Sequence, residues 1–334
     1  MKLLILTHKP EGASFRQRIG LYLDALRGAK VESEVEVLPP SPLRRRRMLR
    51  SASSFDAVLL HRKTLNWLDA RTLRRFGRAV IYDFDDAIMY RASRPGAASA
   101  KRRHAFDRTV GIADLVIAGN SYLADRAREG CRHVEVLPTG LCVSDYAPAV
   151  SKGEQDRPIR LVWIGSRSTL KYLRLLVPVL EELGQRLPGL VLRIIADDFL
   201  ELEHMKVEKK TWSLETQYAD LATADIGIAP LPDNAYTRGK CGFKILQYMA
   251  ASLPVIASPV GVNGEYVREG ESGFHASEAE QWIDATEKLV HSPELRKTMG
   301  AAGRDIVRTH YDREALAPRF CELVTQAMAA RGQT

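Results

Sequence analysis

The chain alternates short apolar runs with longer stretches of helical spacing, and this alternation occurs twice. Runs of strand length, such as residues 3–7 and 57–60, are each followed by an amphipathic stretch. This alternation predicts βα units that build a parallel sheet covered by helices. It stops over the polar, proline-containing stretch 145–158 and restarts at residue 159. The fold class that we predict is therefore α/β, with two Rossmann-like domains facing a central cleft.

The 334 residues are enough for two cores of ordinary size. We place a first domain at 1–148, a second at 149–312, and a C-terminal helix at 313–334 that packs back toward the first domain. We predict strands at 3–7, 31–38, 57–60, 79–82, 115–118, 133–137, 159–164, 190–196, 225–229, 254–257 and 273–275. After the first strand we predict one helix, capped at Ser14, that buries Ile19, Tyr22, Leu23 and Leu26. Later helices are predicted at 169–186, 214–222, 243–251, 278–291, 294–310 and 313–330.

The composition is that of a globular protein, with 45% hydrophobic and 27% charged residues. No apolar run approaches the roughly 20 residues that a membrane-spanning helix needs. The N-terminus has no signal-peptide pattern, and the four cysteines show no metal-like spacing, so we expect a cytoplasmic protein with free thiols. The net charge of +8 favours anionic partners: phosphates, anionic lipid or nucleic acid.

The segment 234–265 has the properties of an anion site. A loop carrying Arg238, Gly239, Lys240 and Gly242 leads from a predicted strand into a helix. Glycines let the backbone approach a ligand closely, and the positive end of a helix favours a phosphate. If the helix begins early enough, Lys240 and Lys244 share one face with the amide at 247, which suits a diphosphate with its ribose. The alternative is an ordinary amphipathic helix with solvated lysines.

At these residues the sequence resembles the GT-B glycosyltransferases, in particular the large retaining group called family 4. The run QYMAASLPVIAS at 247–258 follows that family's Met-Ala-x-Gly-x-Pro-Val-Ile-Ala-Ser stretch. The similarity continues through Gly261, Glu265, 270–274, 296–300 and 302–304, and so covers most of 159–312. The resemblance implies a nucleotide-sugar donor bound by the second domain, an acceptor bound by the first, and transfer with retention. It implies no metal and no cofactor.

Two positions depart from the family's Glu-x7-Glu signature. The second Glu, which holds the donor ribose, is Gln247 here, and an amide can still hydrogen-bond a diol. The first Glu, which contacts the transferred sugar, is replaced by Gly239, so Asp233 in the same loop is our candidate for that contact. The resemblance also places Gly242 and Phe243 at the donor ribose or sugar.

A second block ends the strand that opens the second domain. The resemblance implies that its Gly165, Arg167 and Lys171 reach the donor diphosphate, together with Arg238, Lys240 and Lys244. Cations there would stabilise the negative charge that builds on the leaving nucleoside diphosphate. The alternative is a capped helix with surface cations.

The first half carries candidates for the acceptor. Ser14, Arg16 and Arg18 follow the first strand and suggest contact with a donor or acceptor phosphate, although they also fit plain surface residues. Asp85 and Asp86 follow another strand, where a carboxylate orients an acceptor hydroxyl, acts as a base, or simply caps a helix. His104 is a weaker catalytic candidate. Asp83 and Asp85 also match an Asp-x-Asp metal motif of the GT-A fold, which we set aside because a second Rossmann-like domain does not belong to that architecture.

Residues 41–50 form a short basic, amphipathic segment in which Leu43, Met48 and Leu49 interleave with arginines. We predict reversible docking to the inner face of a membrane, against the alternative of a solvated charge run. The arginines of this segment are Arg44, Arg45, Arg46, Arg47 and Arg50.

The sequence thus predicts a glycosyltransferase that moves a sugar from a nucleotide-diphosphate sugar to an acceptor. The acceptor classes are a lipid-linked or cell-envelope glycan, which would place the enzyme in polysaccharide biosynthesis, a protein, or a small molecule. One alternative is a catalytically silent nucleotide-sugar-binding protein. A nucleic-acid-binding protein is disfavoured because the basic residues are scattered and no zinc or RNP-like motif is present, and a nicotinamide dehydrogenase because no GxGxxG follows either domain's first strand.

Overall fold

The computed structural model describes residues 1–91, 94–148 and 157–330. The chain divides into two compact units, each described by itself below. Unit 1 comprises residues 1–141, 234–241 and 313–334, and unit 2 comprises residues 142–233 and 242–312. We predicted a domain boundary within 145–158, and residues 149–156 of that stretch lie outside the described residues. The last four residues of the predicted C-terminal segment also lie outside them.

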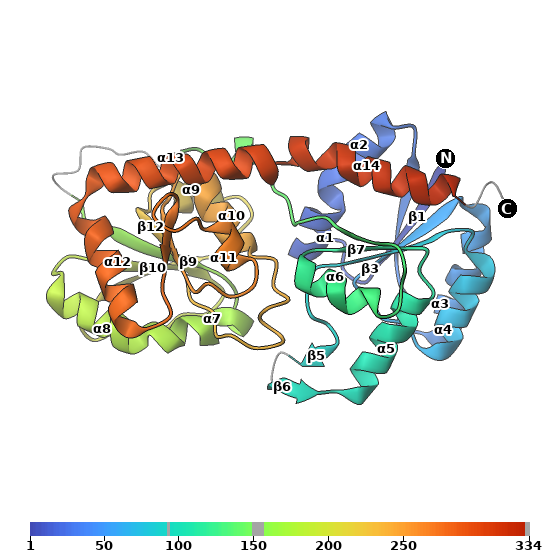
Figure 1. The fold of residues 1–334 in the computed structure, drawn as a ribbon, viewed down its shortest axis with the longest axis horizontal. Helices are drawn as coiled ribbons and strands as arrows, with labels where there is room; N and C mark the ends of the chain where they lie inside the picture. Colours follow the sequence, from blue (N-terminus) through green and yellow to red (C-terminus); the bar gives the residue numbers. More distant parts are fainter. Residues whose placement is uncertain (92–93, 149–156, 331–334) are drawn as a thin grey trace. The chain divides into compact units, whose positions relative to one another are not determined.

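Unit 1 is built on a six-stranded parallel sheet with strand order β2-β1-β3-β4-β7-β8 (Figure 1). Each strand agrees with a predicted one to within two residues at either end. The central strands β1, β3, β4 and β7 are mainly apolar runs between turn signals. A short antiparallel pair, β5 (Tyr90–Arg91) and β6 (Arg94–Ala98), was not predicted. The sheet strands are β1 (Lys2–Thr7), β2 (Glu32–Val37), β3 (Ala57–His61), β4 (Val80–Phe84), β7 (Leu115–Ala118) and β8 (Val134–Val136).

Successive side chains of each strand enter different cores. Leu4 and Leu6 of β1 pack with α3 (Pro42–Ser51), α4 (Trp67–Phe76), α5 (Ala100–Gly111) and α6 (Ser121–Arg128) on one face. Leu3 and Ile5 pack on the other face with the N-terminal helices and with Phe320 of α14 (Arg313–Ala329). The last helix of the chain therefore completes the core of unit 1.

The first predicted helix is wrong in its details. The structure divides it into α1 (Ala13–Arg18), a 3-10 turn at Gly20–Tyr22, and α2 (Leu23–Gly28). Gly12 stands at the N-cap position in place of Ser14. Ser14 lies inside the first turn, and its hydroxyl is hydrogen-bonded to Nε2 of His61 at 3.1 Å.

Unit 2 repeats the architecture, with a parallel sheet of order β11-β10-β9-β12-β13-β14 (Figure 1). The edge strand β11 was not predicted, because its sequence KVEKKT is polar. The other strands were predicted. The sheet comprises β9 (Arg160–Ile164), β10 (Val191–Ala196), β11 (Lys206–Thr211), β12 (Ile226–Ala229), β13 (Val255–Ala257) and β14 (Gly273–His275).

One predicted helix of unit 2 is also broken. Residues 169–186 form the end of α7 (Arg167–Leu173), a 3-10 turn, and α8 (Val177–Arg186). Pro178 stands in the first turn of α8. Proline is tolerated there because the first N–H groups of a helix have no partner within it, but in the middle of one continuous helix it would break the hydrogen bonding. The remaining helices are α9 (Gln217–Ala222), α10 (Phe243–Ala250), α11 (Asn263–Tyr266), α12 (Ala279–His291) and α13 (Pro293–His310).

Helix α10 packs unusually closely on the sheet of unit 2. A Cβ on Gly227 of β12 would lie 2.5 Å from the ring of Tyr248, so only glycine fits beneath that ring. The Tyr248 hydroxyl accepts a hydrogen bond from Ile164 N at 2.9 Å and donates one to Ile228 O at 3.3 Å. These bonds fix α10 against β9 and β12.

Among the described residues, we find no helix with both the length and the apolar character needed to cross a membrane.

Candidate functional site

The turn from β9 into α7 is tightly built. A Cβ on Gly165 would lie 2.3 Å from the Trp163 ring, so this position requires glycine. Ser166 and Thr169 form a capping box that fixes the start of α7. Arg167 is 72% exposed and lies 3.6 Å from a carboxylate oxygen of Asp198.

Helix α10 begins beside that turn. Gly242 has φ +59°, and a Cβ there would lie 2.9 Å from the Tyr266 ring. The Lys244 ammonium stands 4.3 Å from the centroid of the Trp163 ring, and the Lys171 ammonium stands 5.0 Å from that of Tyr172. Cation–π contacts of this kind hold a cation in place. The predicted cations of unit 2 therefore lie on the elements that surround the carboxyl end of β9.

Gln247 is buried, with only 4% of its surface exposed. Its Nε2 donates hydrogen bonds to the Tyr146 hydroxyl at 3.2 Å and to Gln217 Oε1 at 3.1 Å. Its amide nitrogen is thus used within unit 2, so the predicted ribose contact would rest on the amide oxygen. Phe243 is half-buried and Asp233 is exposed.

The remaining predicted donor residues belong to unit 1, because residues 234–241 pack there. Gly239 is buried, and a Cβ on it would lie 2.6 Å from Ala87 and 2.9 Å from Leu123. The Lys240 ammonium lies 3.3 Å from Asp86 Oδ1 and 4.9 Å from the centroid of the Tyr236 ring.

Lys240 and Lys244 do not share a helix face, because the helix does not begin early enough to include Lys240. Helix α10 starts only at Phe243, and Gly242 before it has a left-handed backbone. Arg238, which is exposed, Gly239 and Lys240 therefore precede the helix.

The carboxyl end of β4 in unit 1 gathers three carboxylates. Asp83 is fully buried and accepts a hydrogen bond from Arg18 Nε at 3.2 Å, within a bidentate pair. Arg18 is only 1% exposed and also donates to Leu137 O. Burial lowers the pKa of Arg18, but the charge of Asp83 raises it further, so the guanidinium stays ionised. The predicted role of Arg18 in binding an external phosphate is therefore wrong, since both its charge and its surface are used inside the fold.

Asp85 and Asp86 face a cation that sequence reasoning missed. Arg62 follows β3 and pairs with Asp86 and, at 3.6 Å, with Asp85. It has φ +62°, which is unusual for a residue with a side chain. Such strain often marks a functional position, but a dihedral angle leaves no signal in a single sequence.

Charge keeps Asp85 ionised. Burial raises the pKa of Asp85, but the charges of Arg62 and Arg18 and a hydrogen bond from Ser14 outweigh that effect and lower it. A carboxylate with a lowered pKa is a weak base, because it takes up a proton poorly near neutral pH. Asp85 therefore suits orientation of a hydroxyl better than removal of its proton.

A neutral histidine supports this cluster. His61 is 1% exposed, and its Nδ1 and Nε2 each lie 3.1 Å from a hydroxyl, that of Thr7 and that of Ser14. Burial, aided by Arg18 and Arg62, lowers the pKa of His61 to about 4. Of the predicted acceptor residues, Ser14 thus joins the cluster, and Arg16 donates to Glu11 O at the surface.

His104 lies on the first turn of α5, where it is exposed and lines a basic cavity of unit 1. Within the described part of the chain, no group of three or more His, Cys, Asp or Glu side chains is arranged to hold a metal ion.

The basic segment forms α3, but it is less amphipathic toward solvent than predicted. Met48 and Leu49 pack into the core of unit 1, and of the three interleaved apolar side chains Leu43 is the exposed one, at 78%. Arg45 and Arg46 lie 2.6 Å and 3.7 Å from the Asp69 carboxylate. Arg44, Arg47 and Arg50 remain exposed.

Comparison with known proteins gives a family match over part of the chain. Residues 142–292 match the family model described as "Glycosyl transferases group 1". No match was found among curated proteins.

Solved structures match over nearly the whole chain. Sucrose-phosphate synthase from Thermosynechococcus elongatus is 17% identical with a TM-score of 0.76, over 99% of this chain and 100% of that one. HepE from Anabaena, in complex with UDP and glucose, is 15% identical with a TM-score of 0.73, over 98% and 100%. A glycosyltransferase from Rickettsia africae is 13% identical with a TM-score of 0.73, over 98% of each chain.

At these identities the structural matches establish the fold, while the family match covers most of unit 2. Both agree with the resemblance drawn from residues 247–258. The two parallel six-stranded α/β sheets have the GT-B fold, and residues 142–292 match the group 1 glycosyltransferases, in agreement with the resemblance predicted from the sequence.

Proposed function

We propose that this glycosyltransferase uses a UDP-sugar as its donor and that unit 2 binds the UDP. The observation that carries the proposal is the corner formed by the Gly165 turn, Trp163 and Lys244, which lies inside the family match. The uridine base is supported by HepE, whose structures contain UDP and UDP-glucose.

The chemistry of donor cleavage explains why cations are needed at this corner. When the bond between the sugar and the diphosphate breaks, negative charge builds on the UDP leaving group. Lys244, fixed against the Trp163 ring, and the exposed Arg167 supply positive charge on α10 and α7. Glycine at 165 and at 242 leaves room for the rings of Trp163 and Tyr266, which pack against the backbone at this corner.

For the acceptor we propose that Asp85 and Asp86 orient the attacking hydroxyl. Transfer proceeds with retention, and the donor phosphate takes the acceptor proton, because the lowered pKa of Asp85 makes this carboxylate a poor base. The exposed arginines of α3 dock reversibly on an anionic membrane surface, which suits a lipid-linked acceptor.

The decisive experiment compares two lysine variants of unit 2. Lys244→Ala removes the cation beside Trp163, and the control Lys206→Ala removes an exposed cation at the first residue of β11. We expect Lys244→Ala to weaken UDP binding at least about tenfold, or about 1.4 kcal/mol, in isothermal titration, and Lys206→Ala to leave it unchanged.

An unchanged dissociation constant in Lys244→Ala would remove this residue from the donor site. UDP release from UDP-glucose should be slowed in the same variant. A wild-type chain that binds UDP-glucose but releases no UDP with any acceptor would instead be a silent nucleotide-sugar-binding protein.

A further inference from the structure

Two adjoining cavities open in unit 1, with volumes of about 560 Å³ and 590 Å³. They share Lys63, Thr64, Lys101 and Ala105 as lining residues. These shared residues come from the segment after β3 and from the first turns of α5, so the cavities meet on elements that the sheet of unit 1 positions. None of the donor residues predicted from the sequence lines them.

The lining is strongly basic. The first cavity adds His104 and Arg108 to the two shared lysines, and the second adds His8, Arg62 and Arg102. Asp69 is the one acidic side chain among the described residues that line them, and it is already paired with Arg45. Positive charge therefore exceeds negative charge at these walls.

Lys63 and Lys101 contribute positive charge to both cavities. In the described part of the chain their ammonium groups have no hydrogen-bond or ion-pair partner, whereas the guanidinium of Arg108 donates to Leu65 O. Both lysine side chains are exposed, and they line both cavities. Two unneutralised cations on neighbouring walls repel each other, and an anion between them relieves that repulsion.

Two neighbouring features, the pKa of His8 and the start of α5, also indicate an excess of positive charge. The pKa of His8 is lowered by burial and then by the charges of Lys63, Arg62 and Lys9. The first turn of α5 contains Lys101 to His104 and no acidic residue, although the positive end of a helix dipole disfavours cations there. This arrangement costs stability when the cavities hold no anion.

We propose that these cavities bind the phosphate groups of a phosphorylated acceptor. This inference rests on the proposed function, because it names the acceptor class of the same reaction. Arg62 lines the second cavity and pairs with Asp86, so it connects the phosphate-binding walls to the carboxylates that orient the hydroxyl. Bound phosphate at Lys63 and Lys101 anchors the acceptor so that its hydroxyl reaches Asp85 and Asp86.

The phosphate can come from two sources. One is the diphosphate of a lipid-linked acceptor, and the exposed apolar side chains Trp67 and Leu68 beside the first cavity suit a lipid chain. Trp67 and Leu68 directly follow the lining residues Leu65 and Asn66. The other source is a soluble sugar phosphate.

The test uses the full chain saturated with UDP, so that the donor site is occupied, in buffer without divalent cations. Inorganic pyrophosphate is titrated calorimetrically into wild type, into Lys63→Ala/Lys101→Ala, and into Arg128→Ala/Arg132→Ala. The last variant loses the same charge from two exposed residues, Arg128 at the end of α6 and Arg132 in the segment before β8. We expect the lysine variant to bind pyrophosphate at least tenfold more weakly, and the arginine variant to match wild type.

Equal pyrophosphate affinity in the lysine variant, or no binding by wild type, would overturn the inference while leaving the UDP site intact. Absence of UDP binding by wild type would instead reject the proposed function. Farnesyl diphosphate and a hexose 6-phosphate are then compared with pyrophosphate. Tighter binding of farnesyl diphosphate identifies a lipid-linked acceptor, and tighter binding of the hexose 6-phosphate identifies a soluble one.

Discussion

The two units carry similar sheets but place their charge networks at different ends. In unit 1 the pairs Arg18–Asp83 and Arg62–Asp86 lie where β3 and β4 end, next to the acceptor candidates. In unit 2 the corresponding end carries glycines and a lysine held on Trp163.

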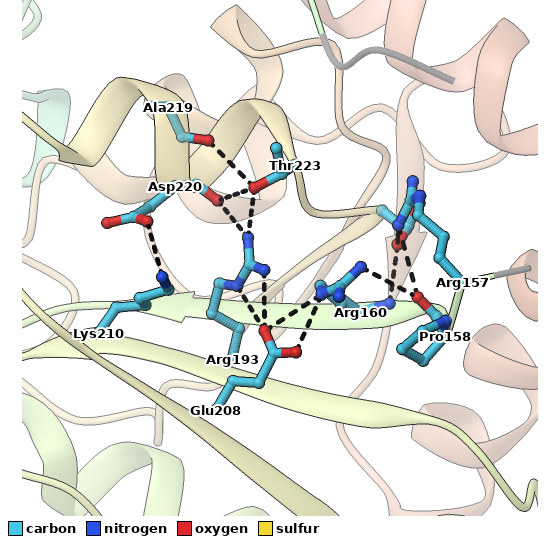
Figure 2. Close-up of polar contacts among 10 residues, drawn as sticks. Arg157, Pro158, Arg160, Arg193, Glu208, Lys210, Ala219, Asp220 and Thr223 are labelled. Atoms are coloured by element: carbon cyan, nitrogen blue, oxygen red, sulfur yellow. Dashed lines mark hydrogen bonds and ion pairs between the residues drawn. The ribbon is translucent and has the colours of Figure 1, made fainter. Parts of the chain in front are cut away.

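The dense network of unit 2 lies in the first halves of its strands. Figure 2 shows Arg160 and Arg193 converging on Glu208 of the edge strand, and Arg193 also bonding to Thr223. Arg157 forms a bidentate pair with Asp225 nearby. Ion pairs therefore shape a candidate site in unit 1, whereas in unit 2 they tie a polar edge strand to its sheet.

The largest effect should come from breaking the buried pair of unit 1. Arg18→Leu leaves the Asp83 carboxylate buried without its partner, because Asp83 has no exposed surface. We expect a loss of about 3–5 kcal/mol in the free energy of unfolding of unit 1, measured by urea denaturation. The double variant Arg18→Leu/Asp83→Leu should recover much of it.

Arg27→Ala is the matched control, since its pair with Asp24 is more than 80% exposed on both sides. It should leave the unfolding midpoint unchanged. A destabilisation equal to that of Arg18→Leu would mean that any arginine in these N-terminal helices matters, and that the buried pair has no special role.

A smaller effect is expected from the network of unit 2. Burial raises the pKa of Glu208, but hydrogen bonds from Arg160 and Arg193 outweigh this and lower it. A carboxylate whose folded pKa is lowered contributes stability above its unfolded pKa of about 4.3, and loses it as the pH falls through the folded value. Glu208→Gln should therefore cost about 1.5–3 kcal/mol at pH 7 and flatten the loss of stability below about pH 4.5.

Urea unfolding at pH 7, 5, 4 and 3 measures both effects. Glu201→Gln serves as control, because this carboxylate is 73% exposed beside Lys209. An acid-unfolding profile of Glu208→Gln that parallels wild type would show that the ion pairs of Figure 2 do not control the stability of this edge.

The sequence predicted the buried strands well and missed the polar edge strand β11 of unit 2. β3 and β12 are short apolar runs buried on both faces, and hydrophobicity alone identifies such strands. β11 is held by register and by the Glu208 ion pairs, which involve residues distant along the chain. Local pattern could not reveal them.

The same distinction applies to the candidate site. The family resemblance predicted the corner of Gly165 and Lys244, because its motifs are contiguous in sequence. Arg62, Lys63 and Lys101 were missed, since the cavities join segments that are separate along the chain. Arg18 looked like a surface cation because its partner Asp83 is 65 residues away.

The smallest effect concerns the surface of unit 1. Arg44 and Arg47 of α3 are exposed, whereas Arg45 and Arg46 are paired with Asp69. If α3 docks on a membrane, Arg44→Ala/Arg47→Ala should reduce co-sedimentation with phosphatidylserine vesicles by roughly tenfold, because each cation contributes at most about 1 kcal/mol. Vesicles of neutral lipid alone should bind neither protein.

The matched control for docking is Arg71→Ala/Arg75→Ala on α4, which removes equal charge from a helix whose arginines lie over Trp67 and Phe76. Raised salt should weaken wild-type binding, because surface charges are screened within about 10 Å at 0.1 M. Equal loss in both variants would indicate a diffuse response to net charge. Equal binding of wild type and Arg44→Ala/Arg47→Ala would remove α3 from any membrane contact and would leave the basic cavities as the proposed acceptor-binding feature of unit 1.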